Sequence, residues 1–207
     1  MDALNAGADA YNVAVGYAAG NNLTTGIQNT LIGGLAGDVL TDADYNVAVG
    51  VSALGADTLG SQSTAIGYSA LTNQNFTTAT NSLNTAVGYQ AGAAVTTGIQ
   101  NTLIGGLAGD ALTDADENVA VGKNALSTDT LGSRSTAVGF GALSTQNFTT
   151  ATNTYNTAVG FQAGVLVTTG IQNVLVGAGT GDALTDGDNN TALGAFALSA
   201  DTKGDKS

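Results

Sequence analysis

Residues 24–38 read TTGIQNTLIGGLAGD, and residues 96–110 repeat that string without a change. Residues 168–182 read TTGIQNVLVGAGTGD, so the string recurs at a constant interval, with Thr24, Thr96 and Thr168 in equivalent places. Self-similarity at a fixed period is typical of solenoids and arrays, in which each unit packs only against its neighbours. The repeat therefore decides the fold.

Each long repeat contains four copies of a shorter unit centred on Asn-[Thr/Val]-Ala-[Val/Ile]-Gly. Three equal steps and one longer step separate successive closing glycines, and this order recurs along the chain. The closing glycines are Gly16, Gly33, Gly50, Gly67, Gly88, Gly105, Gly122, Gly139, Gly160, Gly177 and Gly194. We therefore divide the single repeat domain, residues 1–207, into super-repeats of about 12–83, 84–155 and a partial 156–207.

The core of each unit has the pattern of a β-strand. In the stretch Asn12-Val13-Ala14-Val15-Gly16, the two valines share one face and the alanine takes the other. One such unit cannot bury its apolar face alone, but stacked copies can. We predict an all-β parallel β-solenoid of about 11 coils, each of 17 residues except for a 21-residue coil at every fourth position. At a strand spacing of about 4.8 Å the rod is roughly 50 Å long.

Stacking places equivalent residues of successive coils above one another. The residue that opens the motif is asparagine in three units of four and serine in the fourth. These asparagines are Asn12, Asn29, Asn46, Asn84, Asn101, Asn118, Asn156, Asn173 and Asn190. Their amides can pair along the stack, so we predict a structural asparagine ladder. The chain has no proline, which fits a ladder in which every strand needs its N–H groups.

The middle position of the strand suggests how chains associate. Alanine occupies it in most units, and Leu31, Leu103 and Leu175 replace it once in four. We expect this thin apolar face to contact other chains, because exposed apolar surface of this kind marks interaction sites. Together with the slender core, it favours a homo-oligomer around a common axis.

The composition excludes several functions. The chain lacks His and Cys, so it has no imidazole base, no thiol nucleophile and no ligands of the usual zinc sites. With 4 Lys+Arg against 16 Asp+Glu, its net charge of −12 argues against nucleic acid as a partner. No apolar run is long enough to insert into a membrane. We predict no catalytic, cofactor-binding or metal residues, and no enzymatic activity.

The strings NVAVG, NTAVG and STAIG resemble the head repeats of trimeric autotransporter adhesins. The longer string of residues 84–92, NTAVGYQAG, is similar to repeats in phage tail-fibre proteins. The resemblance covers essentially the whole chain. It implies a left-handed β-roll wound as an intertwined homotrimer, and an extracellular location on a virion fibre or a bacterial cell surface. The chain departs from the adhesin pattern in its longer units and its regular insert.

The extra residues of the 21-residue coils are a candidate recognition element. They lie within residues 74–80 and again within residues 146–152. Insertions in repeat proteins form loops on one face, and these would present phenylalanine and threonine once in each super-repeat to a glycan or another surface receptor. A spacer or a lateral contact explains the insert equally well. The candidate recognition residues are Phe76, Thr77, Thr78, Phe148, Thr149 and Thr150.

Three further columns have both a functional and a structural interpretation. The aspartates Asp38, Asp42 and Asp44 recur in each super-repeat and could supply oxygen ligands to Ca²⁺, although turn formation and solubility explain them better. A column of threonines beginning at Thr24 could match an ice lattice, or could bond local backbone. Aromatic residues that follow the closing glycines could bind glycans, but stacking between coils is favoured; these are Tyr17, Tyr68, Tyr89, Phe140 and Phe161.

We therefore predict a structural and adhesive segment of a surface fibre, either a phage tail fibre or a trimeric adhesin head. It would act as a stiff rod that can attach to receptors or glycans at many points. The alternative is a self-assembling extracellular filament, since uncapped coils expose strand edges. An ice-binding solenoid ranks below both.

Overall fold

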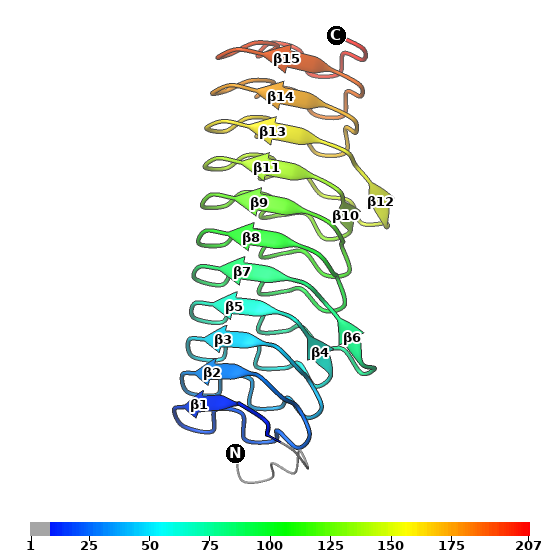
Figure 1. The fold of residues 1–207 in the computed structure, drawn as a ribbon. Coiled ribbons are helices and arrows are strands. Elements are labelled where there is room, and N and C mark those ends of the chain that lie inside the picture. The colour runs from blue at the N-terminus through cyan, green and yellow to red at the C-terminus, as the bar shows by residue number, and fades with distance from the viewer. Residues whose placement is uncertain (1–8) are drawn as a thin grey trace.

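The computed structural model describes residues 9–207, which form a parallel β-solenoid (Figure 1). Successive coils stack from the N-terminal end to the C-terminal end, and no helix occurs within the described residues. One strand from each coil contributes to a single sheet of 11 strands. The predicted all-β parallel β-solenoid of about 11 coils is confirmed.

The long sheet is built from very short strands. In order across the sheet they are β1 (Val13–Val15), β2 (Thr30–Ile32), β3 (Val47–Val49), β5 (Thr64–Ile66), β7 (Thr85–Val87), β8 (Thr102–Ile104), β9 (Val119–Val121), β11 (Thr136–Val138), β13 (Thr157–Val159), β14 (Val174–Val176) and β15 (Thr191–Leu193). Two small sheets lie beside it. They pair β4 (Gly60–Ser61) with β6 (Thr80–Asn81) and β10 (Gly132–Ser133) with β12 (Thr152–Asn153).

The strand register follows the repeat. Val13 pairs with Thr30 of the next coil, and Thr64 pairs with Thr85 across the longer coil. Each coil contributes the same three positions to the sheet, so every sheet column contains equivalent residues. The short two-stranded sheets occur only where the longer coils follow a shorter one.

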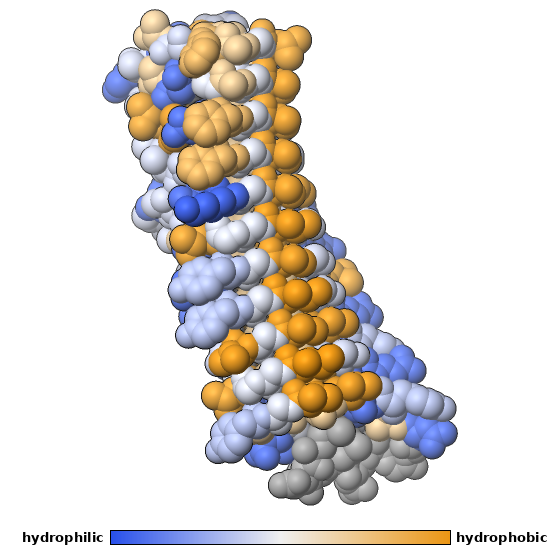
Figure 2. All heavy atoms as spheres, turned by 90° about the vertical axis from the view of Figure 1, so that its left-hand side faces the viewer, coloured by the Kyte–Doolittle hydropathy of each residue, from blue (hydrophilic) through white to orange (hydrophobic). Residues whose placement is uncertain are grey.

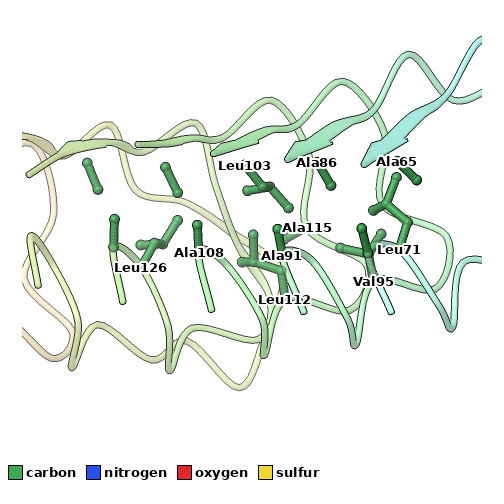
Figure 3. Close-up of a cluster of buried hydrophobic side chains, with 14 of the residues drawn as sticks. Ala65, Leu71, Ala86, Ala91, Val95, Leu103, Ala108, Leu112, Ala115 and Leu126 are labelled. Carbon is green, nitrogen blue, oxygen red and sulfur yellow. The ribbon is translucent and has the colours of Figure 1, made fainter. Parts of the chain in front are cut away.

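The middle residue of each strand points into the solenoid, which corrects the expectation that it faces another chain. Ala65, Ala86 and Leu103 are fully buried within a single chain, and they lie among buried alanine, leucine and valine residues from the opposite wall (Figure 3). The β-branched residues on either side of them face outward instead. Because both faces of the strand are apolar, alternation alone does not reveal which face is inside.

The core keeps a constant width by pairing large residues with small ones. Where the strand carries Leu31, the facing corner carries Gly37, and a Cβ on that glycine would lie 2.8 Å from the leucine Cδ2 atom. Where the strand carries Ala48 or Ala65, leucines occupy the corner, and both Leu54 and Leu71 are fully buried. Where both positions are small, as at Ala86 and Gly92, Leu71 and Leu103 of the adjacent coils fill the space.

The closing glycines form a close-packed backbone ladder. Gly50 has a φ of +137°, and a Cβ on it would lie 2.3 Å from the carbonyl oxygen of Gly67 in the next coil. Both the left-handed backbone and the contact between coils exclude a side chain here. The recurrence of glycine at this position therefore has a steric cause.

Candidate functional site

The asparagine ladder joins each coil to the coils before and after it. The Asn46 backbone N–H donates to Oδ1 of Asn29 at 2.9 Å, and Nδ2 of Asn46 donates to the carbonyl oxygen of Gly60 at 2.9 Å. Asn29 makes the same contacts, with the side chain of Asn12 and the carbonyl of Ala43. Each buried amide thus satisfies buried backbone groups of its neighbours, which makes the ladder part of the structure.

The ladder is interrupted in the first and the second super-repeat, where a buried polar cluster takes its place. Ser63 stands at the asparagine position, and Nε2 of Gln74 donates to its Oγ at 2.8 Å and to Oδ2 of Asp57 at 2.6 Å. Oε1 of Gln74 accepts from Nδ2 of Asn84 at 2.8 Å, where the ladder resumes. Ser82 hydrogen-bonds to Ser63. We call these five residues the first polar node.

A second polar node has the same construction in the following super-repeat. Gln146 donates to Oγ of Ser135 at 2.9 Å and also to Asp129, and it accepts from Asn156 at 2.8 Å. Thr154 takes the place of Ser82. The sequence interpretation missed both nodes because aspartate and glutamine usually indicate turns or solvated surface. The available signal was that Ser, Asp and Gln replace Asn and Leu together, in the same coils.

Burial raises the pKa of the Asp57 carboxyl above its ordinary value of 3.8. The carboxyl is fully shielded from solvent, which penalises its charged form. Hydrogen bonds from Gln74 and from the backbone N–H groups of Phe76 and Gly60 act in the opposite direction but do not cancel the desolvation.

The insert differs from the exposed polar–aromatic bulge that was expected. Phe76 and Phe148 are only 6% and 8% exposed, respectively. The backbone N–H of Phe76 donates to Oδ1 of Asp57, so this phenylalanine adjoins the polar node. The exposed tips of the two bulges consist of Thr77, Thr78 and Ala79 and of Thr149, Thr150 and Ala151. The structure thus leaves hydroxyl and methyl groups, and no aromatic ring of the insert, for an outside partner.

The recurring aspartates do not converge into a cation site. Among residues 9–207 there is no group of three or more acidic side chains placed to hold a metal ion. Oδ1 of Asp44 instead accepts the backbone N–H of Ile27 at 2.8 Å, one coil away. Asp116 and Asp188 bond the equivalent N–H groups of Ile99 and Ile171. These carboxylates therefore cap turns.

The threonine column that suggested ice binding hydrogen-bonds within the chain. Oγ1 of Thr41 donates to the carbonyl of Thr58 at 3.1 Å, and Thr113 makes the same bond to Thr130 at 3.0 Å. Such bonds fix the turn from one coil to the next. The hydrogen of each such hydroxyl is thus used within the chain, and only the oxygen lone pairs remain for water.

The outward rows of the long sheet form an uncharged surface, which we call the sheet face. Its first row consists of Val13, Thr30, Val47, Thr64, Thr85, Thr102, Val119, Thr136, Thr157, Val174 and Thr191. Its second row is entirely aliphatic: Val15, Ile32, Val49, Ile66, Val87, Ile104, Val121, Val138, Val159, Val176 and Leu193. Figure 2 shows the hydrophobic stripe that runs along the rod. No described residue covers this stripe.

A third row follows the glycine ladder and flanks the sheet face; we call it the outer row. It consists of Tyr17, Gly34, Val51, Tyr68, Tyr89, Gly106, Lys123, Phe140, Phe161, Ala178 and Ala195. Tyr68 and Tyr89 stack with ring centroids 5.6 Å apart, and Phe140 and Phe161 stack at 5.5 Å. The predicted stacking between consecutive coils is confirmed. The ring faces that meet within each pair are therefore occupied.

Comparison with known proteins does not assign the chain to a group: no family model, no curated protein and no solved structure matches it. Residues 9–207 enclose no pocket. The same residues include no helix that could cross a membrane. The candidate functional surfaces are thus the sheet face, the outer row and the bulges of the longer coils.

Proposed function

We propose that the chain is a stiff segment of a surface fibre, and that it assembles side by side with copies of itself through the sheet face. The observation that carries this proposal is the sheet face itself, where one row is aliphatic throughout and the other contains only valine and threonine. A contiguous apolar surface along a rod of roughly 50 Å is unusual for a chain that remains monomeric. The resemblance to fibre repeats suggests three chains around a common axis on a virion or cell surface.

The charge distribution supports burial of this face against another copy. The chain has a net charge of −12, yet neither row of the sheet face carries a charged residue. Two copies can therefore bring their sheet faces together without desolvating an ion or opposing like charges at contact distance. The outward β-branched residues, rather than the buried alanines, would supply the contact area.

Lateral assembly is tested by placing one charge at the centre of the sheet face. Ile104→Lys puts an ammonium on an exposed position of β8, whereas Ala79→Lys adds the same charge at an exposed position of the first bulge. Light scattering should give the wild-type chain and Ala79→Lys the mass of a trimer, and Ile104→Lys a lower mass. Circular dichroism verifies that both variants are folded.

Two results would contradict lateral assembly. One is an Ile104→Lys protein that keeps the wild-type mass. The other is a series of polymers that lengthen with concentration in both variants, which would favour the alternative of an end-to-end filament.

We also propose that the rod is adhesive, because its surface features recur every four coils. The exposed bulges and the aromatic pairs each occur twice, four coils apart, which corresponds to about 19 Å along the rod at the usual strand spacing. Several weak sites on one stiff support bind a repeating ligand much more tightly than one site does.

A further inference from the structure

Two glycines in the outer row are not required by the fold. A Cβ built on Gly34 or on Gly106 would meet no atom within 4 Å, and neither residue has a left-handed backbone. Other coils place valine, lysine, tyrosine or phenylalanine at the same position. The outer row is therefore open at these two coils, and the opening leaves room for a group from outside the chain.

The opening at Gly106 exposes one face of an aromatic ring. The backbone N–H of Leu107 donates to the carbonyl of Tyr89 at 2.9 Å, so Gly106 lies in the coil directly after Tyr89. Tyr68 stacks on the side of the preceding coil, at an interplanar angle of 11°. On the side of the following coil the outer row offers no side chain to cover the other face of the Tyr89 ring, because Gly106 stands there, and Tyr89 is 56% exposed.

A cation stands on the far side of the same opening. The backbone N–H of Asn124 donates to the carbonyl of Gly106 at 3.1 Å, which places Lys123 one coil further along the outer row. Lys123 is exposed and forms no salt bridge with any residue of 9–207, whereas Arg134 and Lys203 are both paired with carboxylates. In a chain with a net charge of −12, an unpaired ammonium next to a free ring face is a distinctive combination.

We propose that Tyr89, Gly106 and Lys123 bind a pyranose ring that carries a carboxylate, such as a uronic acid residue of a polysaccharide. The C–H face of a sugar packs on an aromatic ring at a carbon–carbon distance of about 3.5–4 Å. This is close to the coil spacing of about 4.8 Å, so the sugar takes the level of Gly106. Its carboxylate then faces the ammonium of the following coil.

The equivalent positions in the other two super-repeats lack one or more of the features found at Gly106. Gly34 lies between Tyr17 and Val51, and it offers a ring face without a cation. The third copy has Phe161, Ala178 and Ala195, which again lacks a cation and is partly filled by a methyl group. The inference deepens the adhesive part of the proposed function and rests on it, but it does not depend on lateral assembly.

The test uses trigalacturonic acid as the probe and isothermal titration calorimetry at low ionic strength. Gly106→Val fills the opening with a side chain that Val51 shows to be compatible with the row, and it should abolish binding. Lys123→Gln should weaken binding about tenfold or more, as expected for the loss of a charge-assisted contact. Gly34→Val makes the same substitution at the opening without a cation and should leave the affinity unchanged.

Several outcomes would overturn the inference: no saturable binding by the wild-type chain, equal loss in Gly106→Val and Gly34→Val, or equal affinity for neutral galactotriose. Light scattering on the same samples separates the two proposals. If the rod assembles as proposed but does not bind the probe, this inference alone is wrong. If the chain binds the probe but Ile104→Lys keeps the wild-type mass, only the proposal of lateral assembly is wrong.

Discussion

The interior of the solenoid is filled in two ways, and consecutive pairs of coils alternate between them. In one pair the inner wall carries Val95 and Leu112, and in the other it carries Asp129 and Gln146. Apolar stacking determines which side of a strand is buried, but apolar side chains pack equally well against those of any other coil. The hydrogen bonds of a polar node are directional and can be made only by the correct neighbours. We infer that the apolar coils supply most of the burial and that the nodes fix the register.

Replacement of the central residue of a node should give the largest loss of stability. Gln74→Leu removes both donors to Oδ2 of Asp57 and Oγ of Ser63, and it removes the acceptor of Asn84. The Asp57 carboxylate then stays buried with one oxygen unpaired, which costs about 3 kcal/mol or somewhat more in the free energy of unfolding. Urea denaturation followed by circular dichroism measures the change.

The matched substitution in an apolar coil is Leu112→Ala, at the position equivalent to Gln74. It creates a cavity in a fully buried site and should cost about 2–4 kcal/mol. If Gln74→Leu proves neutral or stabilising while Leu112→Ala is costly, the node is only a poorer filling of the core and does not fix the register.

The same contrast explains what the sequence could and could not predict. The glycine spacing and the Val-Ala-Val pattern predict the coils and the parallel sheet, because periodicity determines which residues stack. They do not predict that the valines point outward, since both faces of the strand are apolar. Tyr45 and Gln28 adopt left-handed backbones with φ of +61° and +57°, against their intrinsic preference. The backbone N–H groups of both residues donate to carbonyls of the preceding coil, and such bonds are not visible in a single unit.

Acidification should stabilise the rod, with Asp57 of the first node contributing part of the effect. Burial raises the pKa of Asp57 in the folded state above its ordinary value of 3.8. A raised carboxyl pKa means that the folded state binds the proton more tightly than the unfolded state does. The midpoint of thermal unfolding should therefore rise as the pH falls through the folded pKa of Asp57, and should level off below about 3.8. Asp38 and Asp110 shift in the same direction because they are partly desolvated.

Measurements at high salt and on Gln74→Leu distinguish the contribution of the buried carboxyl to this pH dependence from that of the exposed carboxylates. High ionic strength screens the repulsion among exposed carboxylates but leaves a buried carboxyl almost unaffected. The rise should therefore persist at high salt. It should also begin at a higher pH in Gln74→Leu, because the hydrogen bond from Gln74 lowers the pKa of Asp57. A midpoint that does not change with pH at high salt would show that Asp57 titrates as an exposed group.

The smallest effect is expected from deletion of residues 77 and 78, which form the outer part of the first bulge. The backbone N–H of Leu59 donates to the carbonyl of Phe76, and that of Thr80 donates to the carbonyl of Leu59, and a regular parallel ladder leaves one residue between two such partners. The deletion leaves Ala79 alone between them and so restores a regular ladder there, and the free energy of unfolding should change by less than about 1 kcal/mol. Deletion of Ser82 alone removes one residue instead of two, but it takes away a hydroxyl that bonds Ser61 and Ser63 and should be far more damaging. The reverse order of the two effects would mean that the bulge, and not the buried cluster beneath it, holds the longer coil in place.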